Sequence, residues 1–159
     1  MKGSARASQA VVSQLRQSPS LTAFGTSVRI EAEANHVRLE LSDGEYLPLF
    51  DTGDGRLNAR GEALVRAAAL AIMALPYDLK LEGHTDANPS LTPGYSNWEL
   101  SADRANAARR ILLSSGIPEA RLKGISGLAA TRPLMQQSPH LPVNRRISIV
   151  LVIENNAAS

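Results

Sequence analysis

Apolar and charged residues alternate along two short segments, residues 28–32 and 37–41. A period of two is typical of strands that have one buried and one solvated face. Because Asn35 and His36 lie between the segments, we expect a β-hairpin. Its Arg and Glu side chains recur on the solvated face and are expected to pair across the two strands. We interpret these charges as a surface salt ladder rather than a binding site.

Helical periodicity appears nearer the N-terminus, in a segment rich in Gln, Ser and Ala. Val11, Val12 and Leu15 fall on one helical face, and Pro19 ends the pattern. This spacing predicts a short amphipathic helix over residues 8–18. The pattern leaves open the alternative that this segment is a frayed leader.

Two longer helices and three further strands are predicted downstream. Asn58 is a good N-cap for a helix that continues to about residue 74. Ser96 and Glu99 have the spacing of a capping box, which predicts a second helix that runs to about residue 114. The strands are expected at residues 79–83, 121–126 and 147–153.

The order of these elements predicts an α+β fold, a two-layer sandwich in which a mixed β-sheet has helices packed on one face. The length of 159 residues is enough for one domain. We expect a leader or linker with a short helix over residues 1–24, the folded domain over residues 25–154 and a polar tail over residues 155–159. No apolar run has the length of a transmembrane helix, and the start lacks the apolar centre of a signal peptide. If the full protein is exported or anchored, the segment responsible is expected to lie outside this chain.

Composition and charge exclude several kinds of partner and site. The 17 basic and 15 acidic residues nearly balance, without a dense basic run, so nucleic acid is not an expected partner. The absence of cysteine excludes disulfides, thiolate metal sites and a cysteine nucleophile. The histidines lack metal-ligand spacing, and the turn over residues 51–55 has too few oxygen ligands for a calcium loop. We therefore expect no metal, no cofactor and no catalytic residue, and we interpret His84 as a structural histidine.

The candidate site lies where a predicted strand ends and the capped helix begins. Asp86 follows the strand, and a stripe at i, i+3, i+4 and i+7 of the helix carries Asn97, Leu100, Ser101 and Arg104. The first helical turn and Arg104 suit a carboxylate, while Asp86 suits an ammonium group. Together they fit an amino-acid zwitterion. Spacing alone leaves equally open that Asp86 and Arg104 pair with each other and fix the loop to the helix.

Several motifs, taken together, resemble the OmpA-like peptidoglycan-binding domain. They span roughly residues 45–153 and comprise Thr85-Asp86, Asn97-x-x-Leu100-Ser101-x-x-Arg104-Ala105, Gly116, Gly127 and Asn144-Arg145-Arg146. The runs Gly83-His84-Thr85-Asp86 and Gly94 to Ala107 are similar to the periplasmic domain of the flagellar stator protein MotB. Ser148, which stands where many family members have an acid, favours the same branch.

The resemblance implies a site that binds the diaminopimelate-containing stem peptide of peptidoglycan without covalent chemistry. Asp86 and Arg104 match the acid and the arginine that hold the amino and carboxylate ends of diaminopimelate in the family. The other matching positions of the ligand-binding site are Thr85, Asn97, Leu100, Ser101, Arg145 and Arg146. Whether Arg145 faces the groove or the core edge is left open. Replacing Arg104 with alanine is expected to abolish wall binding and leave the fold nearly intact.

The same resemblance implies an anchor rather than an enzyme. It predicts that the domain attaches a flagellar motor stator to the cell wall, as the periplasmic part of an inner-membrane protein in a Gram-negative-type bacterium. The expected partners are peptidoglycan, a second copy in a homodimer, and a MotA-like membrane subunit reached through a transmembrane segment absent from this chain. The alternatives are an OmpA-like anchor of another envelope complex, a peptidoglycan hydrolase, and a structural protein with a closed groove.

Overall fold

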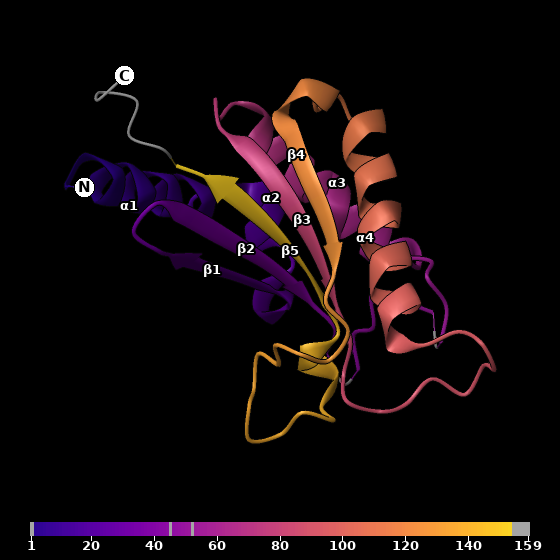
Figure 1. Ribbon diagram of the computed structural model, residues 1–159. Helices are drawn as coiled ribbons and strands as arrows, with labels where there is room; N and C mark the ends of the chain where they lie inside the picture. The colour runs from indigo at the N-terminus through magenta and orange to yellow at the C-terminus, as the bar shows by residue number, and fades with distance from the viewer. Residues whose placement is uncertain (1, 45, 52, 154–159) are drawn as a thin grey trace.

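The computed structural model describes residues 2–44, 46–51 and 53–153, which form helices and a five-stranded sheet (Figure 1). The α-helices are α1 (Lys2–Arg16), α2 (Pro19–Thr22), α3 (Ala59–Met73) and α4 (Asn97–Ser114), and the 3-10 helices are η1 (Gly25–Ser27), η2 (Glu119–Arg121) and η3 (Pro142–Asn144). The strands are β1 (Val28–Ala32), β2 (His36–Ser42), β3 (Asp78–His84), β4 (Leu122–Gly127) and β5 (Arg146–Val152). No helix within the described ranges is long and apolar enough to span a membrane. The predicted tail lies outside the described residues.

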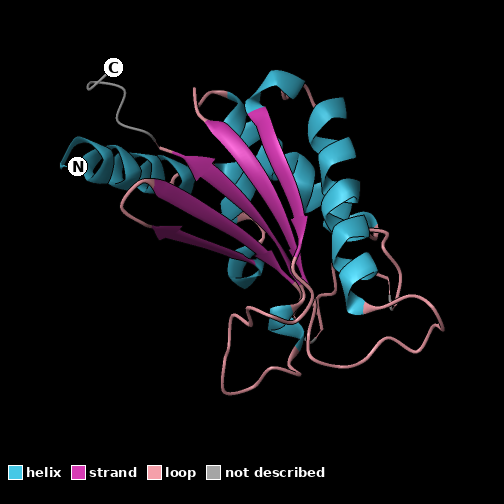
Figure 2. Ribbon diagram, viewed as in Figure 1, coloured by secondary structure: helices cyan, strands magenta, loops and turns pink. Residues whose placement is uncertain are grey.

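The sheet is mixed, with the strand order β1-β2-β5-β3-β4. The pairs β1/β2, β2/β5 and β5/β3 are antiparallel, and the edge pair β3/β4 is parallel. In the view of Figure 2, α2 and α3 lie behind the sheet and α4 stands to the right of it. Aliphatic side chains from both layers form the core. The predicted α+β sandwich with helices on one face of a mixed sheet is confirmed.

The N-terminal helix begins earlier than the sequence pattern predicts. α1 starts at Lys2, and its Val11, Val12 and Leu15 are buried in the same core as the sheet. Ser4 and Ser8 continue the buried face toward the N-terminus, where their hydroxyl groups interrupt the apolar pattern. The helix prediction is therefore confirmed, and the frayed-leader alternative is not what the structure shows. The division of the chain at residue 24 stays a prediction.

The predicted hairpin is present, but its charges find other partners than expected. Arg38 of β2 pairs with Glu82 of β3, and Glu40 pairs with Arg146 of β5. Within the hairpin, Arg38 also lies 3.9 Å from Glu33. Among the described residues, the expected ladder is thus reduced to this one contact, because β2 lies inside the sheet beside β5, and β5 and β3 supply the closer opposite charges.

Both predicted helix caps are formed. Asn58 Oδ1 accepts a hydrogen bond from the Gly61 N–H at 2.8 Å at the start of α3. At the start of α4, Ser96 Oγ accepts from the Trp98 N–H at 3.2 Å, and Glu99 Oε2 accepts from the Ser96 N–H at 3.1 Å. These bonds satisfy N–H groups that the first helical turn leaves free. They also fix where α4 begins, and hence where the predicted site residues stand.

The long loops that follow β3 and β4 gather at one end of the sheet, at the bottom of Figure 1. One covers residues 85–96 and leads into α4, and the other covers residues 128–141 and leads back to β5. Open α/β sheets bind ligands beyond the carboxyl ends of their strands. The candidate site is built at this end.

Candidate ligand-binding site

Asp86 lies at the start of the loop that follows β3 and is 7% exposed. Its Oδ1 accepts a hydrogen bond from the Asn88 N–H at 3.0 Å, which closes a tight local turn. Its Oδ2 accepts one from Arg145 Nη1 at 2.7 Å. The sequence leaves open which way the side chain of Arg145 points. The structure shows that it points at Asp86.

Arg145 joins Asp86 to a second carboxylate, Asp43, which the sequence pattern does not single out. Arg145 Nε donates to Asp43 Oδ2 at 2.7 Å. The other oxygen of Asp43 accepts from the Leu49 N–H at 2.5 Å. Burial raises the pKa of Asp43, although the hydrogen bonds from Arg145 and Leu49 act in the opposite direction. Burial alone would lower the pKa of Arg145, but the hydrogen bonds to the two carboxylates outweigh it and raise that pKa.

Arg104 lies beneath the segment that joins β2 to α3 and is 2% exposed. Its Nε donates to the carbonyl of Asp54 at 3.1 Å and its Nη2 to the carbonyl of Asp51 at 3.4 Å. The guanidinium carbon stands 4.4 Å from the centroid of the Phe50 ring. The third nitrogen, Nη1, is buried and has no hydrogen-bond partner within the described residues. Arg104 is thus held through Nε and Nη2, and among the described residues its Nη1 is left without an acceptor.

Asp86 and Arg104 are neighbours without forming an ion pair with each other in the part of the chain that the structure describes. Burial lowers the pKa of Arg104, while the negative charges of Asp43 and Asp86 oppose that shift. We call the group of Asp43, Asp86, Arg104 and Arg145 the clamp. The alternative in which Asp86 pairs directly with Arg104 is wrong, because Asp86 Oδ2 is bound to Arg145 instead.

Three of the other predicted residues support the clamp from inside the fold. Thr85, Leu100 and Ser101 are all buried. Ser101 Oγ accepts from the Ala129 N–H at 3.0 Å, and the Thr85 N–H donates to the Ala129 carbonyl at 2.9 Å. These bonds tie the loop after β4 to both α4 and the end of β3. The stripe of α4 expected to carry ligand-binding residues is therefore largely covered.

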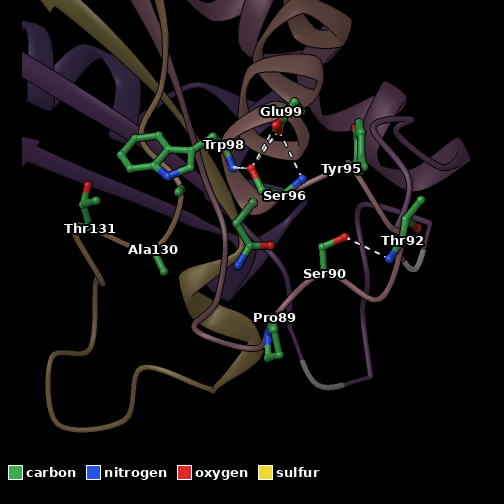
Figure 3. A pocket seen from close by; sticks show the side chains of 12 residues that line it. Pro89, Ser90, Thr92, Tyr95, Ser96, Trp98, Glu99, Ala130 and Thr131 are labelled. Atoms are coloured by element: carbon green, nitrogen blue, oxygen red, sulfur yellow. Dashed lines mark hydrogen bonds between the residues drawn. The ribbon is translucent and has the colours of Figure 1, made fainter.

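Asn97 connects the first turn of α4 to the clamp. Its Nδ2 donates to the carbonyl of Asn88 at 2.9 Å, and the N–H of Asn88 binds Asp86. Asn97 also lines a groove of about 750 Å³ between the loop after β3, the start of α4 and the loop after β4 (Figure 3). Asn97 therefore connects the lining of the groove to Asp86 of the clamp through Asn88.

Arg146 points to the face of the sheet opposite the helices, since neighbouring residues of a strand face opposite sides. Its Nε donates to Glu40 Oε2 at 2.8 Å, and its Nη2 donates to the carbonyl of Arg132 at 2.8 Å. Its Nη1 also donates to the carbonyl of Asn144 in η3 at 3.4 Å. The structure does not bring Arg146 together with the clamp.

His84 belongs to the same polar face of the sheet as Arg146. It is buried, and its Nε2 lies 3.1 Å from Glu82 Oε1, to which Arg38 is also hydrogen-bonded. Burial lowers the pKa of His84. Burial alone would raise the pKa of Glu82, but the hydrogen bonds with His84 and Arg38 lower it to about 2. These contacts fit a structural histidine.

We expect the protein to lose stability in acid through Glu82 and His84. Both pKa values are lowered in the folded protein, so the unfolded chain binds these protons more tightly and stability falls as the pH falls. The loss runs from about pH 4.5 to about 2 for Glu82 and begins below about pH 6.5 for His84. Arg38, Glu40 and Arg146 are the charged groups that face this pair from β2 and β5.

Urea unfolding at a series of pH values measures this loss. The variant Glu82→Gln should flatten the lower part of the pH dependence, and His84→Gln the upper part. Two variants that both retain the pH dependence of the parent protein would contradict the assignment to this pair.

The arrangement of the clamp can recognise charge. Its two carboxylates and two guanidinium groups balance, so it suits a ligand that is itself neutral overall but carries separated charges. The described residues contain no group of three or more His, Asp or Glu side chains placed to hold a metal ion.

Comparison with known proteins identifies the family. Residues 49–146, more than half of the chain, match the model of the OmpA family. The chain belongs to the OmpA family. Motility protein B of Escherichia coli K12 is 36% identical to it over 140 residues, which are 87% of this chain and 46% of that protein. The chain thus spans about half the length of the curated relatives that it matches.

Solved structures share this OmpA-family fold. A putative MotB-like protein from Desulfovibrio vulgaris has a TM-score of 0.79 at 21% identity, covering 96% of this chain and 98% of that one. The periplasmic domain of Helicobacter pylori MotB (residues 90–256) has a TM-score of 0.74 at 23% identity, covering 87% and 86%. The cell wall anchor of the type VI secretion system from Pseudomonas aeruginosa has a TM-score of 0.70 at 22% identity, covering 89% and 99%. The predicted resemblance to the MotB branch of the family is confirmed.

Proposed function

We propose that this OmpA-family domain binds peptidoglycan without covalent chemistry and anchors a flagellar motor stator of the MotB type to the cell wall. The family match and the identity to Motility protein B support the stator assignment. The observation that supports binding is the buried, unpartnered Nη1 of Arg104 among the described residues. A buried charged donor without an acceptor costs free energy, and a ligand carboxylate would remove that cost.

The ligand that fits the clamp is the diaminopimelate side chain of the stem peptide, in which the carbon next to the terminal carboxylate also bears an ammonium group. Asp86 receives the ammonium, and Arg104 receives the carboxylate. Arg145 now occupies Asp86 Oδ2, yet its Nε is also bound to Asp43. When the ammonium takes the Asp86 oxygen, Arg145 keeps an ionic partner in Asp43. The exchange therefore leaves no buried charge unpaired, which would be costly.

The remaining predicted residues act around the clamp in this proposal. Asn97 forms its edge, while Thr85, Leu100 and Ser101 hold its floor. Arg146 fixes the start of β5 through Glu40 and thereby keeps the neighbouring Arg145 in place.

The cellular setting is inferred for the whole protein of which this chain covers a part. We propose a periplasmic location, a homodimer and a MotA-like membrane subunit as partner, by analogy with the relatives named Motility protein B. The anchor of another envelope complex is the second candidate, supported by the fold shared with the type VI secretion anchor. The higher identity to Motility protein B favours the stator.

Titration calorimetry with two stem peptides tests the proposal. One peptide contains diaminopimelate, and the other contains lysine at that position, which keeps the ammonium and lacks the carboxylate. We expect saturable binding of the first without cleavage, and affinity for the second lower by about ten- to hundredfold, since a hydrogen bond between charged groups contributes on the order of 1.5–3 kcal/mol. Equal affinities would contradict the role of Arg104, and cleavage detected by mass spectrometry would support a hydrolase.

A further inference from the structure

Arg145 makes the contact with Asp86 that a ligand ammonium would need. Its Nη1 donates to Asp86 Oδ2 at 2.7 Å, while Asp86 Oδ1 already accepts from the Asn88 N–H at 3.0 Å. An ammonium group and a guanidinium group are both charged N–H donors, so they compete for the same carboxylate oxygen. In the free protein, Arg145 therefore occupies the ammonium position of the clamp.

Arg145 is the member of the clamp that is easiest to move. Its side chain is 28% exposed, whereas the side chains of Asp86 and Asp43 are 10% and 2% exposed. Arg104 is buried and bound to two main-chain carbonyls. Separating a partly exposed ion pair costs little free energy, whereas separating a buried pair leaves a charge without a partner. We therefore expect Arg145 to be displaced while the other three side chains stay in place.

Asp43 is placed to keep Arg145 paired after such a displacement. Its Oδ2 accepts from Arg145 Nε at 2.7 Å, through a different nitrogen from the one that binds Asp86. Its Oδ1 accepts from the Leu49 N–H at 2.5 Å, so the carboxylate is fixed to the main chain. The bond to Arg145 Nε can persist when Nη1 leaves Asp86. The strength of this bond then determines how readily Arg145 gives up Asp86.

We propose that Arg145 blocks Asp86 in the free protein and that Asp43 is the positioning residue that holds Arg145 when the ligand displaces it. Arg145 thus lowers the affinity of the clamp for its ligand, and Asp43 raises it. The inference rests on the proposed function, because it takes an ammonium group on Asp86 as its starting point.

Calorimetry of Arg145→Gln with the diaminopimelate peptide and the lysine peptide tests the blocking role. The affinity for both peptides should rise about fivefold, since the variant removes the competitor of the ammonium group that both carry. Arg132→Gln is the matched control, because it removes the same charge from an exposed side chain in the loop after β4. The affinity of this control should equal that of the parent protein.

Asp43→Asn tests the positioning role. It should lower the affinity for both peptides about fivefold, because Arg145 would have no second carboxylate to hold it away from Asp86. Asparagine keeps the oxygen that accepts from the Leu49 N–H. In the double variant with Arg145→Gln this loss should disappear, since no guanidinium group is left to position. A merely structural role of Asp43 would give the same loss in both backgrounds.

NMR of the arginine Nε–H groups provides a measurement on the parent protein. The Arg145 signal, assigned by its absence in Arg145→Gln, should stay protected from solvent exchange when the diaminopimelate peptide is bound, because Asp43 still accepts from this group. Loss of the protection on binding would show that Asp43 does not hold the displaced side chain.

The outcomes separate this inference from the proposed function. If Arg145→Gln binds the diaminopimelate peptide more weakly and the lysine peptide as before, Arg145 contacts the ligand carboxylate. The blocking role is then rejected and the proposed function stands. Affinities equal to those of the parent protein also reject the blocking role. Binding that appears in Arg145→Gln and not in the parent protein supports it, whereas no binding by either protein rejects the proposed function together with the inference.

Discussion

Replacing Gly83 with alanine is expected to lower the free energy of unfolding by about 3 kcal/mol, because the added methyl group would enter the backbone of α4. A Cβ at this position lies 1.9 Å from the carbonyl oxygen of Ser101 and 2.8 Å from its carbonyl carbon. These atoms belong to a helix, so no side-chain rotation relieves the overlap, and β3 and α4 must separate. Urea unfolding followed by circular dichroism measures the change as a shift of the midpoint.

Gly124→Ala is the matched control for this prediction. Gly124 lies on β4, which pairs with β3, and the nearest atom to its added Cβ is Lys80 Cγ at 3.9 Å, an ordinary contact. Its free energy of unfolding should stay within about 1 kcal/mol of the parent protein. A Gly83→Ala protein as stable as Gly124→Ala would show that α4 does not lie this close to β3.

The example of Gly83 shows what the sequence predicts about the fold and what it does not. From the sequence, Gly83 is expected to allow a sharp turn out of the strand. In the structure it lies inside β3, and glycine is needed because α4 approaches its Cα. The capping box of Ser96 and Glu99 was predictable because its signal is local. The approach of a helix to a strand depends on two segments distant in the chain, and no local pattern carries it.

The charged pairs of the sheet also depend on segments that are distant in the chain. The alternation of β1 and β2 predicts the strands and their faces, but the partners of Arg38 and Glu40 come from β3 and β5. β5 is the last strand in the chain and lies between β2 and β3. Its place in the strand order, which periodicity does not contain, decides which charges meet.

The candidate site was predictable in part for similar reasons. Helical spacing and the position of Asp86 after a strand bring Asp86 and Arg104 to one region. Asp43 lies in a turn with no periodic pattern, and only its contact with Arg145 shows its role. The burial of Arg104 also changes one expectation, because an alanine there would leave two carbonyls without a donor and a void beside Phe50. Arg104→Ala is now expected to destabilise the fold.

Replacing Asp86 with asparagine is expected to weaken binding of the diaminopimelate peptide about ten- to hundredfold, since it removes a hydrogen bond between charged groups. Asparagine keeps the size of the side chain and the oxygen that accepts from the Asn88 N–H. It loses the negative charge that holds Arg145 now and the ligand ammonium on binding. Asp103→Asn is the control, because Asp103 binds the Tyr95 hydroxyl outside the clamp. Calorimetry should show unchanged affinity for this control.

The variant Arg104→Lys, compared with Asp86→Asn, assigns the two ends of the clamp. Lysine keeps the buried charge but lacks the planar fork that binds a carboxylate through two N–H groups. Arg104→Lys should therefore lower the affinity for the diaminopimelate peptide. The affinity for the lysine peptide, which is already weaker, should stay unchanged because that peptide has no carboxylate for Arg104 to bind. Asp86→Asn should lower the affinity for both peptides by the same factor, since both carry the ammonium group. If Asp86→Asn affects the diaminopimelate peptide alone, Asp86 does not hold the ammonium and the two ends of the clamp are assigned wrongly.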